Sequence, residues 1–262
     1  MSPTAAQRAI LRQVVIGSPD LDATTRELRE SLGVARGFAD PLLEEIGMAD
    51  ETIRVGPEAH LEVVAPLRGD VSLAAWLRKG GGGGGYALSI QVPDLTPHLA
   101  AAAQQGVRVV ADLVAYGHRI VQLHPGDMGL LIELDEIADP AAWFWDDIEA
   151  EVATAPRVDD VLAVEITSHD PRAQATLWAS VLGAEVDPTD SEPRIALGRR
   201  EIRFVKGSRK MLSAIDLAAV DPEAHAGTAV DVAGVHLRVV DPAAATVTAA
   251  AATAQHAQLG SA

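Results

Sequence analysis

The sequence contains no cysteine. That absence excludes disulfide bonds, metal sites built from thiolates and cysteine nucleophiles. Long apolar segments are absent as well. The chain has no run of about 18 apolar residues, and residues 1–17 lack the basic and apolar regions of a secretion signal. The sequence therefore predicts a cytoplasmic protein that does not interact with a membrane.

Positive charge and aromatic side chains are scarce. The chain has 21 Lys and Arg residues against 37 Asp and Glu residues, which gives a formal net charge of −16. This charge repels a polyphosphate backbone, and no stretch rich in Lys or Arg offsets it, so we expect no nucleic-acid partner. Because aromatic residues make up only 3% of the chain, we expect any cavity to be lined mainly by aliphatic and small side chains.

The sequence contains a stretch that recurs later in the chain. Residues 13–33 and 163–183 carry Val, Ile, Ser, Asp, Ala, Leu and Gly at matching positions. A weaker similarity relates residues 14–21 to residues 88–95, which share Ile and a Pro-Asp-Leu turn. With 262 residues and 48% apolar content, the chain is large enough for two domains of ordinary size. The pattern predicts a tandem repeat in which each domain is itself a doubled unit.

The first unit reads as a strand, a helix and a hairpin. Residues 11–17 are typical of a strand, Asp20 can cap the following helix, and Gly33 can end it. Strands at 52–55 and 60–66 then form the hairpin. The later units repeat this order, with strands expected at 86–92, 107–110, 118–124, 129–134, 161–167, 194–198, 201–205, 211–220 and 234–240, and helices at 94–106 and 171–182.

These elements predict an α+β fold of tandem βαβββ modules. The last module is degenerate, because residues 221–231 leave room for only a short helix. We expect a first domain over residues 1–140, a linker over 141–157, a shorter second domain over 158–241 and a flexible Ala-rich tail over 242–262.

Six consecutive glycines at 80–85 precede the strand expected at 86–92. A phosphate-binding loop follows a strand, opens a helix and carries a Lys with Ser or Thr. Here the glycines follow residues typical of a helix and open a strand, so the N–H groups of a helix start are not available to bind an anion. The run therefore predicts a flexible hinge between two modules.

The paired modules, the stretch VVIGSPDLDAT (14–24) and the stretch LHPGDMGLLIELDE (123–136) together resemble the vicinal oxygen chelate superfamily. That superfamily includes glyoxalase I, methylmalonyl-CoA epimerase, extradiol dioxygenases and the fosfomycin and bleomycin resistance proteins. The second stretch looks most like the epimerases and other glyoxalase-like members. The resemblance covers residues 11–136 and reaches 160–240 only through the repeat. It implies two half-open barrel domains, the second of them degenerate.

In that family the first and last strands of each unit place ligands on a divalent metal inside the barrel. Residue by residue, these positions fall on Gln13, Glu62, Ala87 and Glu133. Three of them keep oxygen donors, which suit Mg²⁺ or Mn²⁺, while Ala87 stands where the family has His. The alternative is a cavity without metal, in which Glu62 or Glu133 acts as an acid, a base or a hydrogen-bond acceptor.

A histidine elsewhere could replace the missing ligand and favour Zn²⁺ or Ni²⁺. The candidates are His60, which shares a strand face with Glu62, and His118. For contacts with a substrate we expect four residues of the first domain, namely Ser89, Gln91, His118 and His124.

The other polar and aromatic candidates have two interpretations each. In the second domain the corresponding positions hold Arg203 and Arg238, which either serve structure or clamp an anionic substrate. Trp143 and Trp145 are expected to pack the linker onto the first barrel rather than to line a ligand pocket.

The leading functional hypothesis is a lyase or isomerase that acts on a small carbonyl or oxygenated substrate. Glu62 and Glu133 would be its catalytic residues, because a carboxylate desolvated in a barrel has a raised pKa and can remove a proton next to a carbonyl. Gln13, Gln91 and Ser89 would hold the developing enolate oxygen. The alternative is a non-catalytic protein that binds a drug or metabolite in the same groove. Two modules in tandem can complete a barrel within one chain, so both a monomer and a homodimer agree with the sequence.

Overall fold

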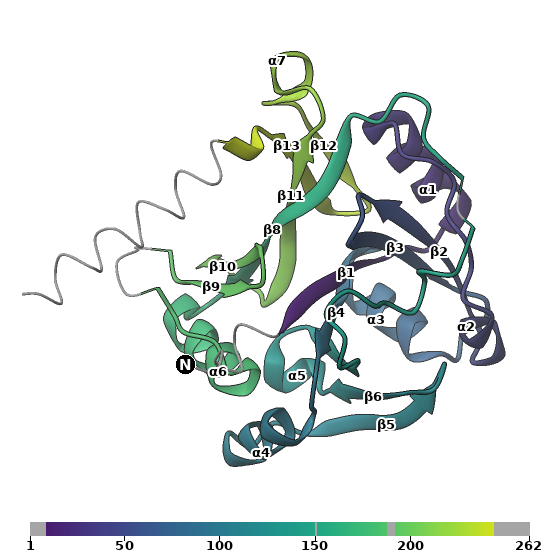
Figure 1. Ribbon diagram of the computed structural model, residues 1–262. Coiled ribbons are helices and arrows are strands. Elements are labelled where there is room, and N and C mark those ends of the chain that lie inside the picture. Colours follow the sequence, from purple (N-terminus) through teal and green to yellow (C-terminus); the bar gives the residue numbers. More distant parts are fainter. Residues whose placement is uncertain (1–8, 150, 188–191, 244–262) are drawn as a thin grey trace, which may run out of the picture.

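The computed structural model of the chain describes residues 9–149, 151–187 and 192–243 (Figure 1). Most of the tail expected at 242–262 lies outside these residues. The described residues form a mixed α+β fold around one 13-stranded sheet, which confirms the predicted fold class. Within these residues, no helix is both long enough and apolar enough to cross a membrane.

The elements follow each other in four groups that each start with a strand. The first half of the chain contains β1 (Ile10–Gly17), α1 (Leu21–Leu32), α2 (Pro41–Glu45), β2 (Met48–Val55), β3 (Ala59–Pro66), α3 (Ser72–Gly80), β4 (Gly84–Val92), α4 (Thr96–Gln104), β5 (Val109–Ala115), β6 (His118–Leu123), α5 (Pro125–Met128) and β7 (Leu131–Glu136). The second half contains β8 (Val158–Ser168), α6 (Pro171–Leu182), β9 (Arg194–Leu197), β10 (Arg200–Lys206), β11 (Met211–Ala219), α7 (Pro222–His225), β12 (Ala229–Val232) and β13 (Val235–Val240).

The two longest helices begin and end in the same way. The carboxylate of Asp20 accepts a hydrogen bond from the Ala23 N–H at 2.9 Å, and Gly33 ends α1 with a φ of 67°. In α6, Asp170 caps the N–H of Ala173 at 3.0 Å and Gly183 again has a φ of 67°. These caps fall on matching positions of the sequence repeat, which is why both helices could be predicted from local signals.

Within each half, the first strand of a group pairs in parallel with the last strand of the same group. The order is β2-β3-β1-β4-β7-β6-β5 in the first half and β9-β10-β8-β11-β13-β12 in the second half. Among the residues that the structure describes, only the second group has three strands after its first helix, as in a full βαβββ unit. The first group is βαββ, because Phe38 forms just an isolated bridge with Thr52 instead of an additional strand.

The two halves join where β4 pairs with β11, at Gly85 opposite Leu212. A Cβ atom on Gly85 would lie 2.4 Å from the Cβ of Leu212, so only glycine permits this close approach. Gly84 and Gly85 belong to β4. The expectation of a flexible hinge over 80–85 is therefore wrong for this end of the glycine run, which is packed strand.

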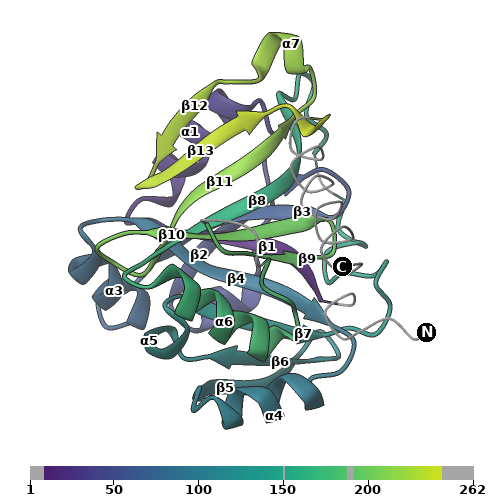
Figure 2. The ribbon, with the colours of Figure 1, turned by 90° about the vertical axis from the view of Figure 1, so that its left-hand side faces the viewer.

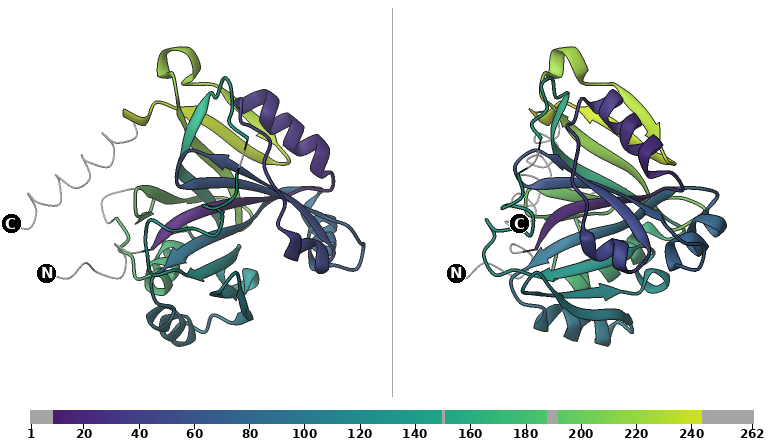
Figure 3. Two further views of the ribbon diagram at one scale, coloured as in Figure 1. Left: turned by 45° about the vertical axis from the view of Figure 1, so that its right-hand side comes forward. Right: turned by 90° about the vertical axis from the view of Figure 1, so that its right-hand side faces the viewer.

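Each half also places a helix against the other half. Figure 2 shows α6 beside α4 and α5, and Figure 3 shows α1 beside β12. The indole N–H of Trp178 in α6 donates to the Met128 carbonyl at 2.8 Å, and the His98 ring contacts the Val181 carbonyl at 3.0 Å. One hydrophobic core contains buried residues from both halves. Packing is therefore continuous from one half to the other. The predicted domain boundaries stay a prediction.

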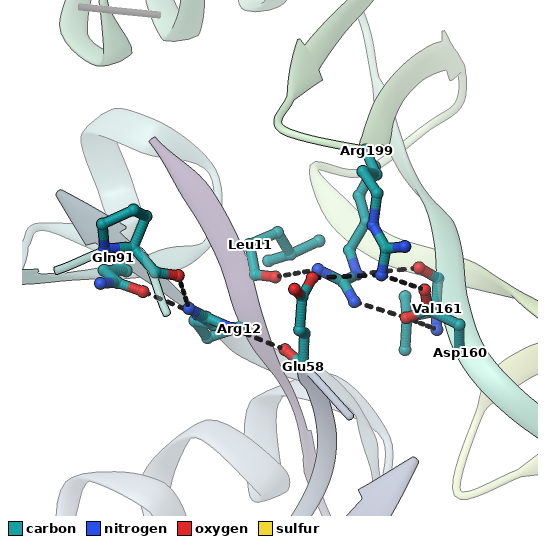
Figure 4. A network of polar contacts seen from close by, with 9 residues as sticks. Leu11, Arg12, Glu58, Gln91, Asp160, Val161 and Arg199 are labelled. Atoms are coloured by element: carbon teal, nitrogen blue, oxygen red, sulfur yellow. Dashed lines mark hydrogen bonds and ion pairs between the residues drawn. The ribbon is translucent and has the colours of Figure 1, made fainter. Parts of the chain in front are cut away.

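A polar network between β1 and β8 also joins the two halves (Figure 4). Arg200, which is 1% exposed, donates to the carbonyl of Leu11 in β1 at 3.1 Å and to that of Val161 in β8 at 2.9 Å, and it pairs with Asp160. Arg199 bridges Asp160 at 3.2 Å and the carboxylate of Glu58 at 3.1 Å. A buried guanidinium that bonds to both halves fixes how they sit together.

Candidate active site

The curled sheet of the first half encloses a cavity of about 400 Å³. Each of the strands β1 to β7 contributes at least one side chain to its wall, and residues 40–46 at α2 and residues 144–145 of the linker line it as well. This volume falls within the range of small-molecule sites. The cavity is therefore the main candidate for a functional site.

A row of polar side chains crosses the cavity on five neighbouring strands. Going along the sheet, these are Glu62 on β3, Gln13 on β1, Ser89 on β4, Glu133 on β7 and Gln122 on β6. Ser89 pairs with Gln13 on one side and with Glu133 on the other, and Gln122 pairs with Glu133. Sheet register thus brings Gln13, Glu62 and Glu133, which are distant in the sequence, to one cavity.

The orientation of the Gln13 amide follows from its neighbours. Its Oε1 accepts hydrogen bonds from the indole N–H groups of Trp143 at 3.2 Å and Trp145 at 2.6 Å. An indole can only donate, so the amide oxygen must face these rings and the amide nitrogen must face the other way. Nε2 accordingly donates to Oε2 of Glu62 at 2.9 Å.

The two carboxyl groups have different environments. Burial raises the pKa of Glu62 well above its usual value, and the nearby carboxylates of Asp50 and Glu133 raise it further, against one hydrogen bond from Gln13. Burial also raises the pKa of Glu133, but its ionised form accepts hydrogen bonds from Gln122 at 2.7 Å and Ser89 at 3.0 Å. Glu133 is thus the better carboxylate and Glu62 the better carboxylic acid.

Two further buried acids lie close to this row and were not singled out from the sequence. Asp135 is 0% exposed, and neither of its carboxyl oxygens has a hydrogen-bond partner among the described residues. Burial raises its pKa well above the usual value, with added contributions from Glu133 and Glu62. Asp50 is 5% exposed, and burial raises its pKa to about 7. Alternation along β7 places Asp135 two residues after Glu133, which is the one sequence signal that could have found it.

The residues at the implied metal positions do not fit a divalent metal. Both indole rings already occupy the oxygen of Gln13, Ala87 offers no donor, and the carboxylates of Glu62 and Glu133 accept hydrogen bonds from neutral amide groups. No group of three or more His, Cys, Asp or Glu residues within the described ranges could hold a metal ion.

Of the predicted substrate contacts, Ser89 lines the cavity and three residues do not. Gln91 is 1% exposed and bonds to Arg12 and to backbone carbonyls. His118 contacts the Glu136 carbonyl at 3.2 Å, and His124 caps α5. His60, a candidate ligand, pairs with Gln13 in the sheet but does not line the cavity, and burial lowers its pKa to about 3.

The two arginines at the matching positions of the second half bind carboxylates of their own half. Arg203 pairs with Asp216, and Arg238 pairs with both Asp216 and Glu165. These ion pairs support the structural interpretation of Arg203 and Arg238 rather than the anion clamp.

The wall of the cavity is more aromatic than the composition suggests. Tyr86, Tyr116, Phe144 and Trp145 all line it. Aliphatic and small side chains nevertheless make up most of the wall, as expected. The expectation that Trp145 avoids the pocket is wrong. Trp143 and Trp145 are buried as predicted, at 6% and 7% exposure, but residues 144 and 145 also face the cavity. The clustered stretch AAWFWDD is the signal that could have indicated this.

Comparisons with known proteins agree with this architecture. Residues 12–121 match the family model of the Glyoxalase/Bleomycin resistance protein/Dioxygenase superfamily. Methylmalonyl-CoA epimerase from Bos taurus is 27% identical over 130 residues, which are 48% of this chain and 73% of the relative. Ethylmalonyl-CoA/methylmalonyl-CoA epimerase from Cereibacter sphaeroides is 29% identical over 132 residues, which are 48% of this chain and 97% of the relative.

One solved structure extends the likeness across both halves. A hypothetical protein from Staphylococcus aureus superposes with a TM-score of 0.64 and covers 89% of this chain and 99% of its own, at 9% sequence identity. At this identity the likeness shows the fold alone. The overall fold of the described residues, across both halves, is therefore shared with another protein.

Proposed function

We propose that this chain, whose residues 12–121 match the family model of the Glyoxalase/Bleomycin resistance protein/Dioxygenase superfamily, is an isomerase of small carbonyl compounds. The observation that carries the proposal is the pair Glu62 and Glu133 in one cavity, each with a raised pKa and each with a different set of hydrogen-bond donors. The relatives named as epimerases support the same class of reaction.

In the proposed reaction Glu133 removes a proton from the carbon next to the carbonyl group. Gln122 and Ser89 stabilise its carboxylate before the transfer, and the raised pKa makes it a stronger base than a carboxylate in water. Glu62, whose raised pKa favours the acid form, returns a proton to the carbanion from the other side of the cavity. Gln13 orients Glu62, and the two tryptophans orient Gln13.

The experiment is exchange of the α-proton in D₂O, followed by proton NMR. Trial substrates are small chiral thioesters and ketones with one acidic α-proton, including methylmalonyl-CoA, the compound in the names of the relatives. We expect the wild-type protein to exchange the α-proton of at least one of them. Replacing Glu133 with Gln should slow that exchange by about 100-fold or more.

A matched control is the same substitution at a carboxylate that lies outside the cavity. Glu30 on α1 is an exposed carboxylate outside the cavity, so Glu30→Gln should exchange at the wild-type rate. Exchange that survives intact in Glu133→Gln, or that is absent for every trial substrate, would contradict the proposal. Tight binding without exchange would instead support the alternative function, a non-catalytic binder, which the aromatic wall also favours.

A further inference from the structure

The acidic and basic groups that line the cavity are all carboxyl groups. Four carboxyl groups line it, from Asp40, Glu45, Glu62 and Glu133. None of the described residues that line it is Lys, Arg or His. An anionic ligand would therefore enter a desolvated space with negative groups and without a compensating cation, which is costly.

Arg12 and Arg54, on two strands of the cavity sheet, are hydrogen-bonded to other groups of the chain. Arg12 donates to Gln91 at 2.7 Å and to the Pro140 carbonyl at 2.6 Å, and it stacks on Trp143 with 5.6 Å to the ring centre. Arg54 donates to the Trp145 carbonyl at 2.8 Å. Neither arginine lines the cavity. The residues that line the cavity therefore include no guanidinium group that could pair directly with its carboxyl groups.

The aromatic wall points to the same class of ligand. Four of the aromatic residues of this aromatic-poor chain, Tyr86, Tyr116, Phe144 and Trp145, surround one space. The faces of such rings carry partial negative charge and attract ammonium groups. They also provide apolar surface for the body of a ligand.

The polar row leaves one acceptor open. Glu62 is 8% exposed and lines the cavity. Its Oε2 accepts from Gln13, whereas Oε1 accepts no hydrogen bond from the residues that the structure describes. A ligand N–H group can bind at this oxygen when Glu62 is ionised, and an ammonium group placed there favours the ionised form.

We propose that the ligand of this cavity is an organic cation, in which an ammonium group is attached to an apolar body. The ammonium group donates to Oε1 of Glu62 and lies among the carboxylates, while the apolar body packs on Tyr86, Phe144 and Trp145. The inference rests on the cavity assigned under Proposed function and names the charge of its ligand. It does not depend on the proton transfer, because a cation-binding protein without turnover would satisfy it.

The test uses three probes of matched size and different charge with the full chain at pH 7. These are 2-phenylethylamine, 2-phenylethanol and phenylacetate, titrated by calorimetry and by quenching of tryptophan fluorescence. We expect the amine to bind at least about tenfold more tightly than the alcohol, and phenylacetate to bind most weakly. An alcohol or acid that binds as tightly as the amine, or no binding of the amine at up to about 10 mM, overturns the proposal.

Variants identify the groups responsible. Glu62→Gln should weaken binding of the amine about tenfold or more and leave binding of the alcohol unchanged. If Glu62→Gln fails to fold, Asp40→Asn provides the second measurement, because asparagine can still cap α2. It should weaken only the amine, and Glu30→Gln should weaken neither probe. Equal effects on amine and alcohol would contradict the inference.

The two proposals fail in distinguishable ways. Amine binding without α-proton exchange on any carbonyl compound leaves the ligand class standing and removes the isomerase. Exchange on neutral or anionic carbonyl compounds, together with no preference for the amine, leaves the isomerase standing and removes the ligand class.

Discussion

Asp50 is a buried acid whose raised pKa should make the stability of the fold depend on pH. It lies on β2, is 5% exposed, and its two carboxyl oxygens accept the backbone N–H of Asp40, a cavity residue, at 2.9 and 3.1 Å. Burial, with a smaller contribution from the charges of Asp40 and Glu51, raises its pKa from 3.8 to about 7. We expect Asp50→Asn, which keeps an acceptor for the same N–H but cannot ionise, to change how stability depends on pH.

The direction in which stability changes with pH depends on whether the folded or the unfolded chain binds the proton of Asp50 more tightly. The folded chain holds the proton of Asp50 up to about pH 7 and the unfolded chain releases it near 3.8. The stability from this group is therefore fully present below the unfolded value and is lost as the pH rises toward 7. A difference of about three pKa units corresponds to at most about 4 kcal/mol, since one unit is about 1.4 kcal/mol.

The assay is urea unfolding between about pH 4 and pH 8, with the free energy of unfolding extrapolated to water. Relative to wild type, Asp50→Asn should gain about 2–4 kcal/mol between the two ends of this range. Glu30→Gln should show no such gain. A stability difference between Asp50→Asn and wild type that stays constant over the whole pH range would refute the reasoning.

Two further predictions concern the junction of the halves. Arg200→Met should lower the free energy of unfolding by about 3–5 kcal/mol, because it leaves the half-buried Asp160 and two carbonyls without their shared donor. Arg199→Met, at an exposed ion pair, should cost less than about 1 kcal/mol in the same urea experiment. Gly85→Ala should lower the melting temperature through a cost of about 1–3 kcal/mol, because its Cβ would overlap Leu212. Gly69→Ala, with nothing within 4 Å, should leave the melting temperature within about 2 °C of wild type, and equal shifts in both variants would contradict the packing argument.

Local signals account for the part of the fold that could be predicted. Asp20 and Gly33 bracket α1, and the repeat carries the same caps to α6, so the bounds of both helices follow from single residues. The five-residue helix α2 was missed because only its cap at Asp40 and the proline after it distinguish it from a loop. β2 starts at Met48, earlier than expected, since residues 48–51 gain their strand conformation from pairing with β3.

Long-range packing explains what the sequence left open. That Gln13, Glu62 and Glu133 share a cavity could be predicted because the resemblance placed them on neighbouring strands. The stretch AAWFWDD indicates that aromatic residues gather in the linker, but where they pack depends on how the linker docks. The contacts of α1 and α6 with the opposite half depend on how the halves dock, and no local pattern encodes that. The metal expected at Gln13 does not fit because two indole groups from the linker reach its oxygen.

The central claim is that Glu133 removes the α-proton and Glu62 returns a proton, and one measurement tests it most directly. With any substrate that the wild-type protein epimerises in D₂O, proton NMR and chiral analysis would follow exchange and inversion in Glu62→Gln and Glu133→Gln. We predict that Glu62→Gln exchanges the α-proton with retention and does not invert the centre, whereas Glu133→Gln does neither. Inversion at the wild-type rate in either variant, or exchange that depends on Glu62 and not on Glu133, would contradict the account.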